Sequence, residues 1–269
     1  MEAPRQRDPA AGIECAVAAR ALLRVPVEQV APLRKQPGPA PSPFPVSFLK
    51  HSDEQTVVAL AAVFTAIRDH QLPGDFRHWG AVAGPRFLGR ATTAAAVPRF
   101  LAEGAWGVSP HVVPHRSLHA VSGTLSQALK LHGPNFGVGG GPGSEGELML
   151  ADMALLQGMR LPGVWLLFSR CQPDLCPDGS GAPPPGTEIQ ALALALVPVA
   201  AGLPRLALVP APGNHGVVDL GQLGGVFDSP APVRRALSSF WLEWRPAPAV
   251  AAPVPPVAAP WTLAGSHLP

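Results

Sequence analysis

A run of glycines directly before a predicted helix is the part of the sequence best suited to chemistry. Glycine tolerates positive φ angles, and the first turn of a helix presents backbone N–H groups that have no intrahelical partners. Such a turn could bind an anion or an oxyanion. Spacing alone favours the alternative, a tight strand-to-helix corner that needs glycine only for close packing. The residues of this glycine turn are Gly139, Gly140, Gly141 and Gly143.

Known nucleotide-binding patterns do not fit the glycine turn. A phosphate loop of the type G-x-x-x-x-G-K-[ST] requires a lysine, and no lysine lies near the turn. The dinucleotide-binding pattern fails as well, because Ser144 stands where its third glycine belongs. We therefore expect no cofactor.

Ser144, which follows the glycine turn, has two interpretations. With a nearby histidine as base, its hydroxyl group could act as a nucleophile. A serine at this place is more often the N-cap of the helix, and Glu147, three residues later, would complete a capping box. We favour the cap. Glu145 and Glu147 also suit the positive end of the helix.

Three histidines recur at a spacing of four residues, at His111, His115 and His119. On one continuous helix they would align as a metal-like array. Pro110 and Pro114 interrupt that helix, so we expect no metal site.

Two arginines, Arg86 and Arg90, follow a predicted strand. Either could receive a phosphopantetheine phosphate or the acidic surface of a carrier protein. We favour the simpler interpretation, a solvated surface charge. The tryptophans at 79, 106 and 165 are expected in the core.

Composition restricts the class of protein. Hydrophobic residues make up 47% of the chain and charged residues 14%, and the net charge is only +2, with no basic stripe for a nucleic acid. The three cysteines, Cys15, Cys171 and Cys176, suit neither a disulfide framework nor zinc. The apolar stretch over residues 191–203 is interrupted by proline and glycine, so we expect no membrane span. The N-terminus lacks the features of a signal peptide, and we expect a cytoplasmic protein.

Strand and helix patterns alternate along the chain, which predicts an α/β fold with one mainly parallel or mixed sheet and flanking helices. The predicted helices cover residues 13–23, 53–70, 92–103, 120–130, 144–157 and 232–244. The predicted strands cover residues 79–83, 136–138, 164–168, 189–197 and 206–209. We expect an N-terminal segment and proline-rich linker over 1–46, the α/β domain over 47–245 and a proline- and alanine-rich tail over 246–269.

The order of motifs around the glycine turn resembles the N-terminal half of β-ketoacyl synthases. A Gly123-x-x-Ser126 pattern on a helix precedes Gly133-Pro134-Asn135, and a strand, the glycine turn, a helix and a further strand follow. The resemblance covers about residues 81–170. It implies a thiolase-type fold, the first half of the ketosynthase fold.

The sequence departs from that family at the nucleophile. The position of the family's cysteine falls on Pro142 when counted from Gly133 and on Gly141 when counted from Gly158, and neither side chain can attack a thioester. The paired histidines of the family's second half are also missing, Asn214-His215-Gly216 being the nearest match. The chain is similar to the chain-length factors, which lack the cysteine and pair with an active ketosynthase.

The resemblance implies a dimer in which the strand at residues 136–138 pairs with the same strand of a partner, an exposed edge that needs covering. The interface residues it implies are Ser126, Asn135, Phe136 and Val138. The main hypothesis is an inactive partner of a ketosynthase in fatty-acid or polyketide synthesis, with an acyl carrier protein as a further partner. The alternatives are an acyltransferase or thioester hydrolase that uses Ser144, and a homodimeric scaffold.

Overall fold

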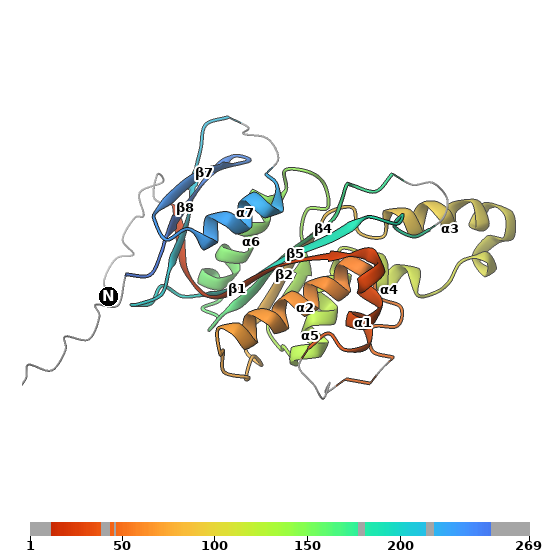
Figure 1. Ribbon diagram of the computed structural model, residues 1–269, viewed down its shortest axis with the longest axis horizontal. Coiled ribbons are helices and arrows are strands. Elements are labelled where there is room, and N and C mark those ends of the chain that lie inside the picture. Colours follow the sequence, from red (N-terminus) through yellow and green to blue (C-terminus); the bar gives the residue numbers. More distant parts are fainter. Residues whose placement is uncertain (1–11, 39–43, 46, 177–180, 214–217, 249–269) are drawn as a thin grey trace, which may run out of the picture.

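The computed structural model describes residues 12–38, 44–45, 47–176, 181–213 and 218–248, and the described residues form one eight-stranded mixed sheet with helices on both faces (Figure 1). The strand order is β3-β2-β4-β5-β1-β6-β8-β7. The strands are β1 (Ile13–Pro26), β2 (Gly80–Pro85), β3 (Asn135–Gly137), β4 (Val164–Gln172), β5 (Glu188–Val197), β6 (Arg205–Pro210), β7 (Val233–Leu237) and β8 (Phe240–Arg245).

The helices lie in two groups, one on each face of the sheet. They are α1 (Val30–Lys35), α2 (Glu54–Asp69), α3 (Arg90–Glu103), α4 (Val112–Arg116), α5 (His119–Leu129), α6 (Glu145–Gly158) and α7 (Leu220–Asp228), with short 3₁₀ turns η1 (Val27–Gln29) and η2 (Gly104–Gly107). Figure 1 shows α6 and α7 on one side of the sheet and α1, α2 and α5 on the other.

The expected α/β class is confirmed. Strand β2 runs parallel to both β3 and β4, whereas β5 runs antiparallel to β4 and β1, so the sheet is mixed. On each face of the sheet, the strands and helices pack around a separate hydrophobic core. One core contains Trp165 and the inner residues of α2, and the other contains Leu148 and Met153 of α6 together with Leu223 of α7.

The N-terminal strand β1 corrects the helix expected over residues 13–23. It pairs with β5 on one side and with β6 on the other, so it lies inside the sheet. Cys15, Ala16 and Val17 are all buried, because helices cover both faces, and this erases the alternation that marks a half-exposed strand. The boundary expected at residue 46 therefore does not separate the N-terminal residues from the sheet.

The C-terminal hairpin corrects the helix expected over residues 232–244. Strands β7 and β8 pair antiparallel and are joined at Ser238, whose φ is +49°. Leu237, Leu242 and Trp244 are buried, and Trp244 packs edge-on against Phe227 of α7 with the ring centroids 5.4 Å apart. The helix α7 was not predicted. The expected tail begins at residue 246 and lies outside the described residues from residue 249.

The segment from α3 through η2 to α4 forms a helical hairpin that extends beyond the sheet at the right of Figure 1. Helix α3 lies close to the helix expected over residues 92–103 and runs through Pro98. Trp106 in η2 is 98% exposed, which corrects its expected place in the core, whereas Trp165 is fully buried. Helix α2 begins after its N-cap Asp53, whose side chain accepts a hydrogen bond of 2.9 Å from the N–H of Gln55.

Candidate functional site: the glycine turn at the start of helix α6

The glycine turn connects the edge strand β3 to the helix α6. Gly139, Gly140 and Gly143 have φ angles of +79°, +118° and +84°, which only glycine adopts readily. The carbonyl oxygen of Gly140 accepts a hydrogen bond of 2.9 Å from the N–H of Phe87, which fastens the turn to the chain after β2. Conformation therefore requires glycine at three of the four positions.

Ser144 is the residue before α6, but it does not form the expected capping box. Its hydroxyl group donates a 2.9 Å hydrogen bond back to the carbonyl oxygen of Gly141 and caps no N–H group of the helix. Glu147 is exposed. The hydroxyl group therefore stabilises the turn itself.

Glu145, the first residue of α6, is buried at the N-terminus of the helix. Burial raises the pKa of this carboxyl group above its usual range. The backbone N–H groups of Glu145 and Gly143 and the positive charges of Arg86 and Arg170 favour the charged form and partly offset the rise in pKa. The N–H groups that could bind a ligand's anion thus face a carboxylate of the same chain.

Two largely buried arginines lie below the turn at the ends of β2 and β4. Arg86 has a side chain only 15% exposed and forms an ion pair with Asp174, which corrects its expected role as a solvated surface charge. Arg170 is 7% exposed, pairs with Asp219 and donates a 2.9 Å hydrogen bond to the side-chain oxygen of Gln190. Both guanidinium groups already have protein partners. Arg90 is exposed and lies 4.6 Å from the ring centroid of Phe87.

The hairpin β7–β8 covers the start of α6. The hydroxyl group of Ser238 donates a short hydrogen bond to the carbonyl oxygen of Gly143. A Cβ atom on Gly146 would lie 2.9 Å from the ring of Phe240 and 3.2 Å from the carbonyl oxygen of Leu237, so the contact requires glycine. This contact was not predictable from the sequence, because the helical spacing of apolar residues over 232–244 concealed the hairpin.

The cysteines do not supply the missing sulfur at the turn. Cys171 lies in the core on the α2 face of the sheet, 3.8 Å from the side-chain nitrogen of Gln55, and burial raises its pKa to about 12. Cys15 is buried in β1, and this burial raises the pKa of its thiol group as well. Cys176 is exposed. Both buried thiols are held in the unreactive protonated form.

Solved structures of other proteins share this architecture, whereas no family model and no curated protein matches the sequence. One is a ketosynthase in complex with its chain length factor from Xenorhabdus doucetiae, with 13% identity, coverage of 86% of this chain and 98% of the matched chain, and a TM-score of 0.53. Another is a β-ketoacyl synthase from Burkholderia phymatum, with 12% identity, coverage of 69% and 59%, and a TM-score of 0.50. The chain has a ketosynthase-like fold of the thiolase type.

The two similar structures differ in how much of them this ketosynthase-like chain spans. It covers nearly the whole of the matched chain from the Xenorhabdus complex but about three fifths of the Burkholderia synthase.

The implied interface residues lie on both faces of the edge strand of this ketosynthase-like fold. The side-chain nitrogen of Asn135 lies 3.5 Å from the hydroxyl oxygen of Ser126 on α5, whereas Phe136 and Val138 pack against the opposite core. Asn135 and Phe136 belong to β3, Val138 follows this strand directly, and Ser126 lies on the neighbouring helix α5. Strand β3 pairs only with β2 in the described part of the chain. Their role in an interface stays a prediction.

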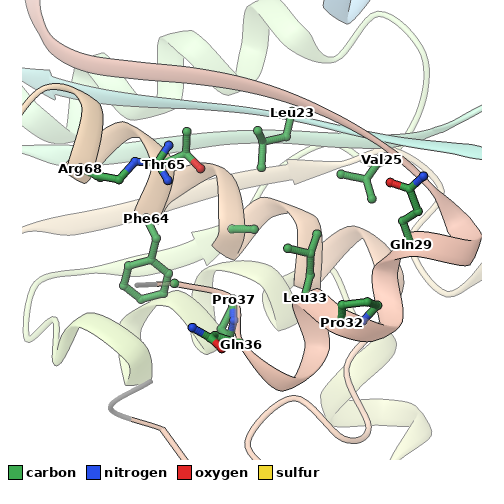
Figure 2. A pocket seen from close by; sticks show the side chains of 12 residues that line it. Leu23, Val25, Gln29, Pro32, Leu33, Gln36, Pro37, Phe64, Thr65 and Arg68 are labelled. Atoms are coloured by element: carbon green, nitrogen blue, oxygen red, sulfur yellow. The ribbon is translucent and has the colours of Figure 1, made fainter. Parts of the chain in front are cut away.

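A cavity of about 530 Å³ lies between β1, α1 and α2 of the ketosynthase-like fold (Figure 2). Leu23, Val25, Leu33 and Phe64 form its apolar lining, and no residue of the glycine turn contributes to it.

Over the residues that the structure covers, no group of His, Cys, Asp and Glu side chains is arranged to hold a metal ion, and no helix is long and apolar enough to cross a bilayer.

Proposed function

We propose that this chain is a catalytically silent ketosynthase-like subunit that pairs with an active β-ketoacyl synthase in fatty-acid or polyketide-type synthesis, as a chain-length factor does. The observation that carries the proposal is the state of the glycine turn. Gly141 and Pro142 stand where the nucleophile belongs, and the buried Glu145 carboxylate faces the N–H groups that would otherwise receive an oxyanion.

Glu145 also works against acyl chemistry at this place. Its carboxyl group occupies the backbone N–H groups at the start of α6 that would otherwise stabilise the negative charge developing on a thioester oxygen during attack. The hydrogen bond from Ser144 to Gly141 directs the serine hydroxyl away from that role, which counts against the hydrolase alternative. The geometry therefore favours a binding role.

A partner surface is supported by two features of the fold. The strand β3 is an edge strand, and edges with unpaired N–H and C=O groups are covered in most native proteins. The α3–α4 hairpin also exposes large apolar side chains, which in a soluble protein mark a site of association. These side chains are Val97, Phe100, Leu101, Trp106 and Val113.

The absence of catalysis is tested with a short-chain acyl thioester and intact-protein mass spectrometry. We expect no covalent acyl adduct on the wild-type chain, and the same result for Ser144→Ala. A Ser144→Cys variant serves as the matched control, because it places a thiol at the same helix start. An adduct on the wild type that disappears in Ser144→Ala would establish the serine enzyme and overturn the proposal.

The partnership is tested by co-expressing the full chain with the ketosynthase encoded nearest to it. We expect a one-to-one complex in analytical ultracentrifugation and a synthase whose product length changes when the chain is left out. A chain that forms only a dimer with itself, and leaves the products of the synthase unchanged, would instead establish the homodimeric scaffold.

A further inference from the structure

Three imidazole rings meet where the α3–α4 hairpin joins the body of the protein. The rings of His51 and His111 are stacked, with centroids 3.9 Å apart and planes 6° from parallel. The ring of His115 lies 5.9 Å from each of them. The spacing of four residues brings His111 and His115 together on α4, and the third ring comes from the turn before α2, 60 residues earlier in the chain.

Arg116, the last residue of α4, stabilises the same contact between α4 and the turn before α2. Its guanidinium group donates a 2.8 Å hydrogen bond to the carbonyl oxygen of His51 and a 3.3 Å hydrogen bond to the hydroxyl oxygen of Thr92 on α3. It also forms a 3.6 Å ion pair with Asp53, the N-cap of α2. The two side chains of this pair are only 18% and 11% exposed.

The charges around the three rings are unevenly distributed. The cations of Lys50 and Arg116 act on His51, and Arg116 also acts on His115. The acidic groups nearby are Asp53, which is paired with Arg116, and Glu54, which is paired with Arg34 at 2.9 Å. A protonated His51 ring would therefore lie near two cations, Lys50 and Arg116, and beside two other imidazole rings.

We propose that His51, His111, His115 and Arg116 form an acid-sensitive joint. The uncharged rings let α4 pack against the start of α2, and protonation of His51 and His115 detaches α4 and loosens the α3–α4 hairpin. The joint is a property of the chain itself and does not depend on a partner or on the proposed function.

The titration of the groups agrees with this geometry. Partial desolvation, followed by the neighbouring charges, lowers the pKa values of His51 and His115 below the ordinary 6.5. Because the pKa of each ring is lower in the folded than in the unfolded protein, the stability that these rings contribute is complete above the unfolded pKa. It is lost as the pH falls from the unfolded pKa through the folded pKa. Histidine is the side chain that changes charge in this range.

Asp53 adds a second acid-sensitive element, with an opposite effect on the whole molecule. Burial raises the pKa of Asp53 to about 6, so the carboxylate that pairs with Arg116 is neutralised near that pH. For global unfolding, a raised carboxyl pKa stabilises the folded state on acidification. A local measurement at the hairpin is therefore required, because a melting temperature would mix the two effects.

Hydrogen exchange with mass spectrometry provides that measurement on the full chain. Between about pH 7.5 and about pH 5.5, after correction for intrinsic exchange, we expect protection of α4 to fall about tenfold while α6 stays protected. In the double variant His51→Gln/His115→Gln, the fall should largely disappear. His78→Gln, which replaces an exposed histidine outside the cluster, is the matched control and should behave like the wild type.

Two results would overturn the proposal. One is protection of α4 that stays constant across this pH range in the wild type. The other is a fall of equal size in the wild type and in the double variant, because the rings would then not be the groups that respond. A limited-proteolysis series over residues 104–118 at the same pH values gives an independent readout of the same opening.

Discussion

Asp152 lies in the middle of α6, completely buried, and neither of its carboxyl oxygens has a hydrogen-bond partner among the residues that the structure describes. Burial raises its pKa well above the ordinary value, so the folded protein holds the proton. Because the folded pKa is higher than the unfolded one, the cost of this residue grows as the pH rises. The helix that would carry a synthase's nucleophile thus contains an unpaired acid in its core.

Replacing this acid with a hydrocarbon should stabilise the protein. We expect Asp152→Leu to raise the free energy of unfolding by about 1–3 kcal/mol at neutral pH, because it removes an unsatisfied buried polar group. The gain should be larger at about pH 8 than at about pH 4. Urea unfolding at both pH values measures it, with Glu147→Gln on the exposed face of α6 as control. A less stable Asp152→Leu protein at the higher pH would contradict this account.

Two glycines near the candidate site should respond to alanine in opposite ways. A Cβ atom on Gly133 would lie 2.4 Å from the carbonyl oxygen of Trp79, whereas Gly158 has open space around it and a helical backbone. We expect Gly133→Ala to lower the free energy of unfolding by about 1–3 kcal/mol. Gly158→Ala should raise it by up to about 1 kcal/mol, since alanine is the better helix former. Denaturant titrations of both variants decide the matter.

At the scale of elements, the sequence revealed those that have one clear signature. The apolar runs of β2, β4 and β5 and the start of α2 lie close to their predicted bounds. Strand β1 was mistaken because both of its faces are buried, so its apolar pattern fits either period. The β7–β8 hairpin was mistaken because Val233, Leu237, Phe240 and Trp241 happen to follow helical spacing.

The candidate site was predictable in its backbone and not in its charges. Positive φ angles demand glycine, so the run at residues 139–143 could be recognised as a turn. Glu145 and Arg170 are separated by 25 residues in the chain, and nothing local in the sequence indicates that the positive charge of Arg170 acts on the Glu145 carboxyl group. Their burial, and the approach of Ser238 to Gly143, depend on tertiary packing alone.

The open edge of β3 gives a sharp test of the proposed partner contact. The N–H of Val138 donates to the carbonyl oxygen of Ala83, so by alternation the N–H groups of Asn135 and Gly137 point away from β2. We expect Asn135→Pro, which removes one outward N–H, to weaken association with the partner about tenfold. Asn135→Ala removes only the side chain and should bind normally. Equal binding by both variants, measured by calorimetry, would argue against strand pairing.

At the scale of the whole molecule, the protruding α3–α4 hairpin carries the exposed apolar surface. Trp106 is 98% exposed and Leu101 78% exposed, so neither contributes much to the folding of the isolated chain. We expect the double variant Trp106→Ser/Leu101→Ser to change the free energy of unfolding by less than about 0.5 kcal/mol per site. The same variant should reduce association with the partner at least about tenfold in sedimentation. A marked loss of stability with unchanged association would contradict the assignment of this apolar surface to partner binding.

The place of β1 between β5 and β6 has a consequence for how the protein is made. Strand β1 leaves the ribosome before both of its neighbours and can pair with them only after residues 188–210 have been synthesised, because its register joins Leu22 to Leu192 and Cys15 to Leu206. Such distant pairing is slow to form and leaves an apolar segment uncovered during translation. A nascent chain stalled before residue 188 should therefore remain sensitive to protease and bound to chaperones, whereas the completed chain should become resistant.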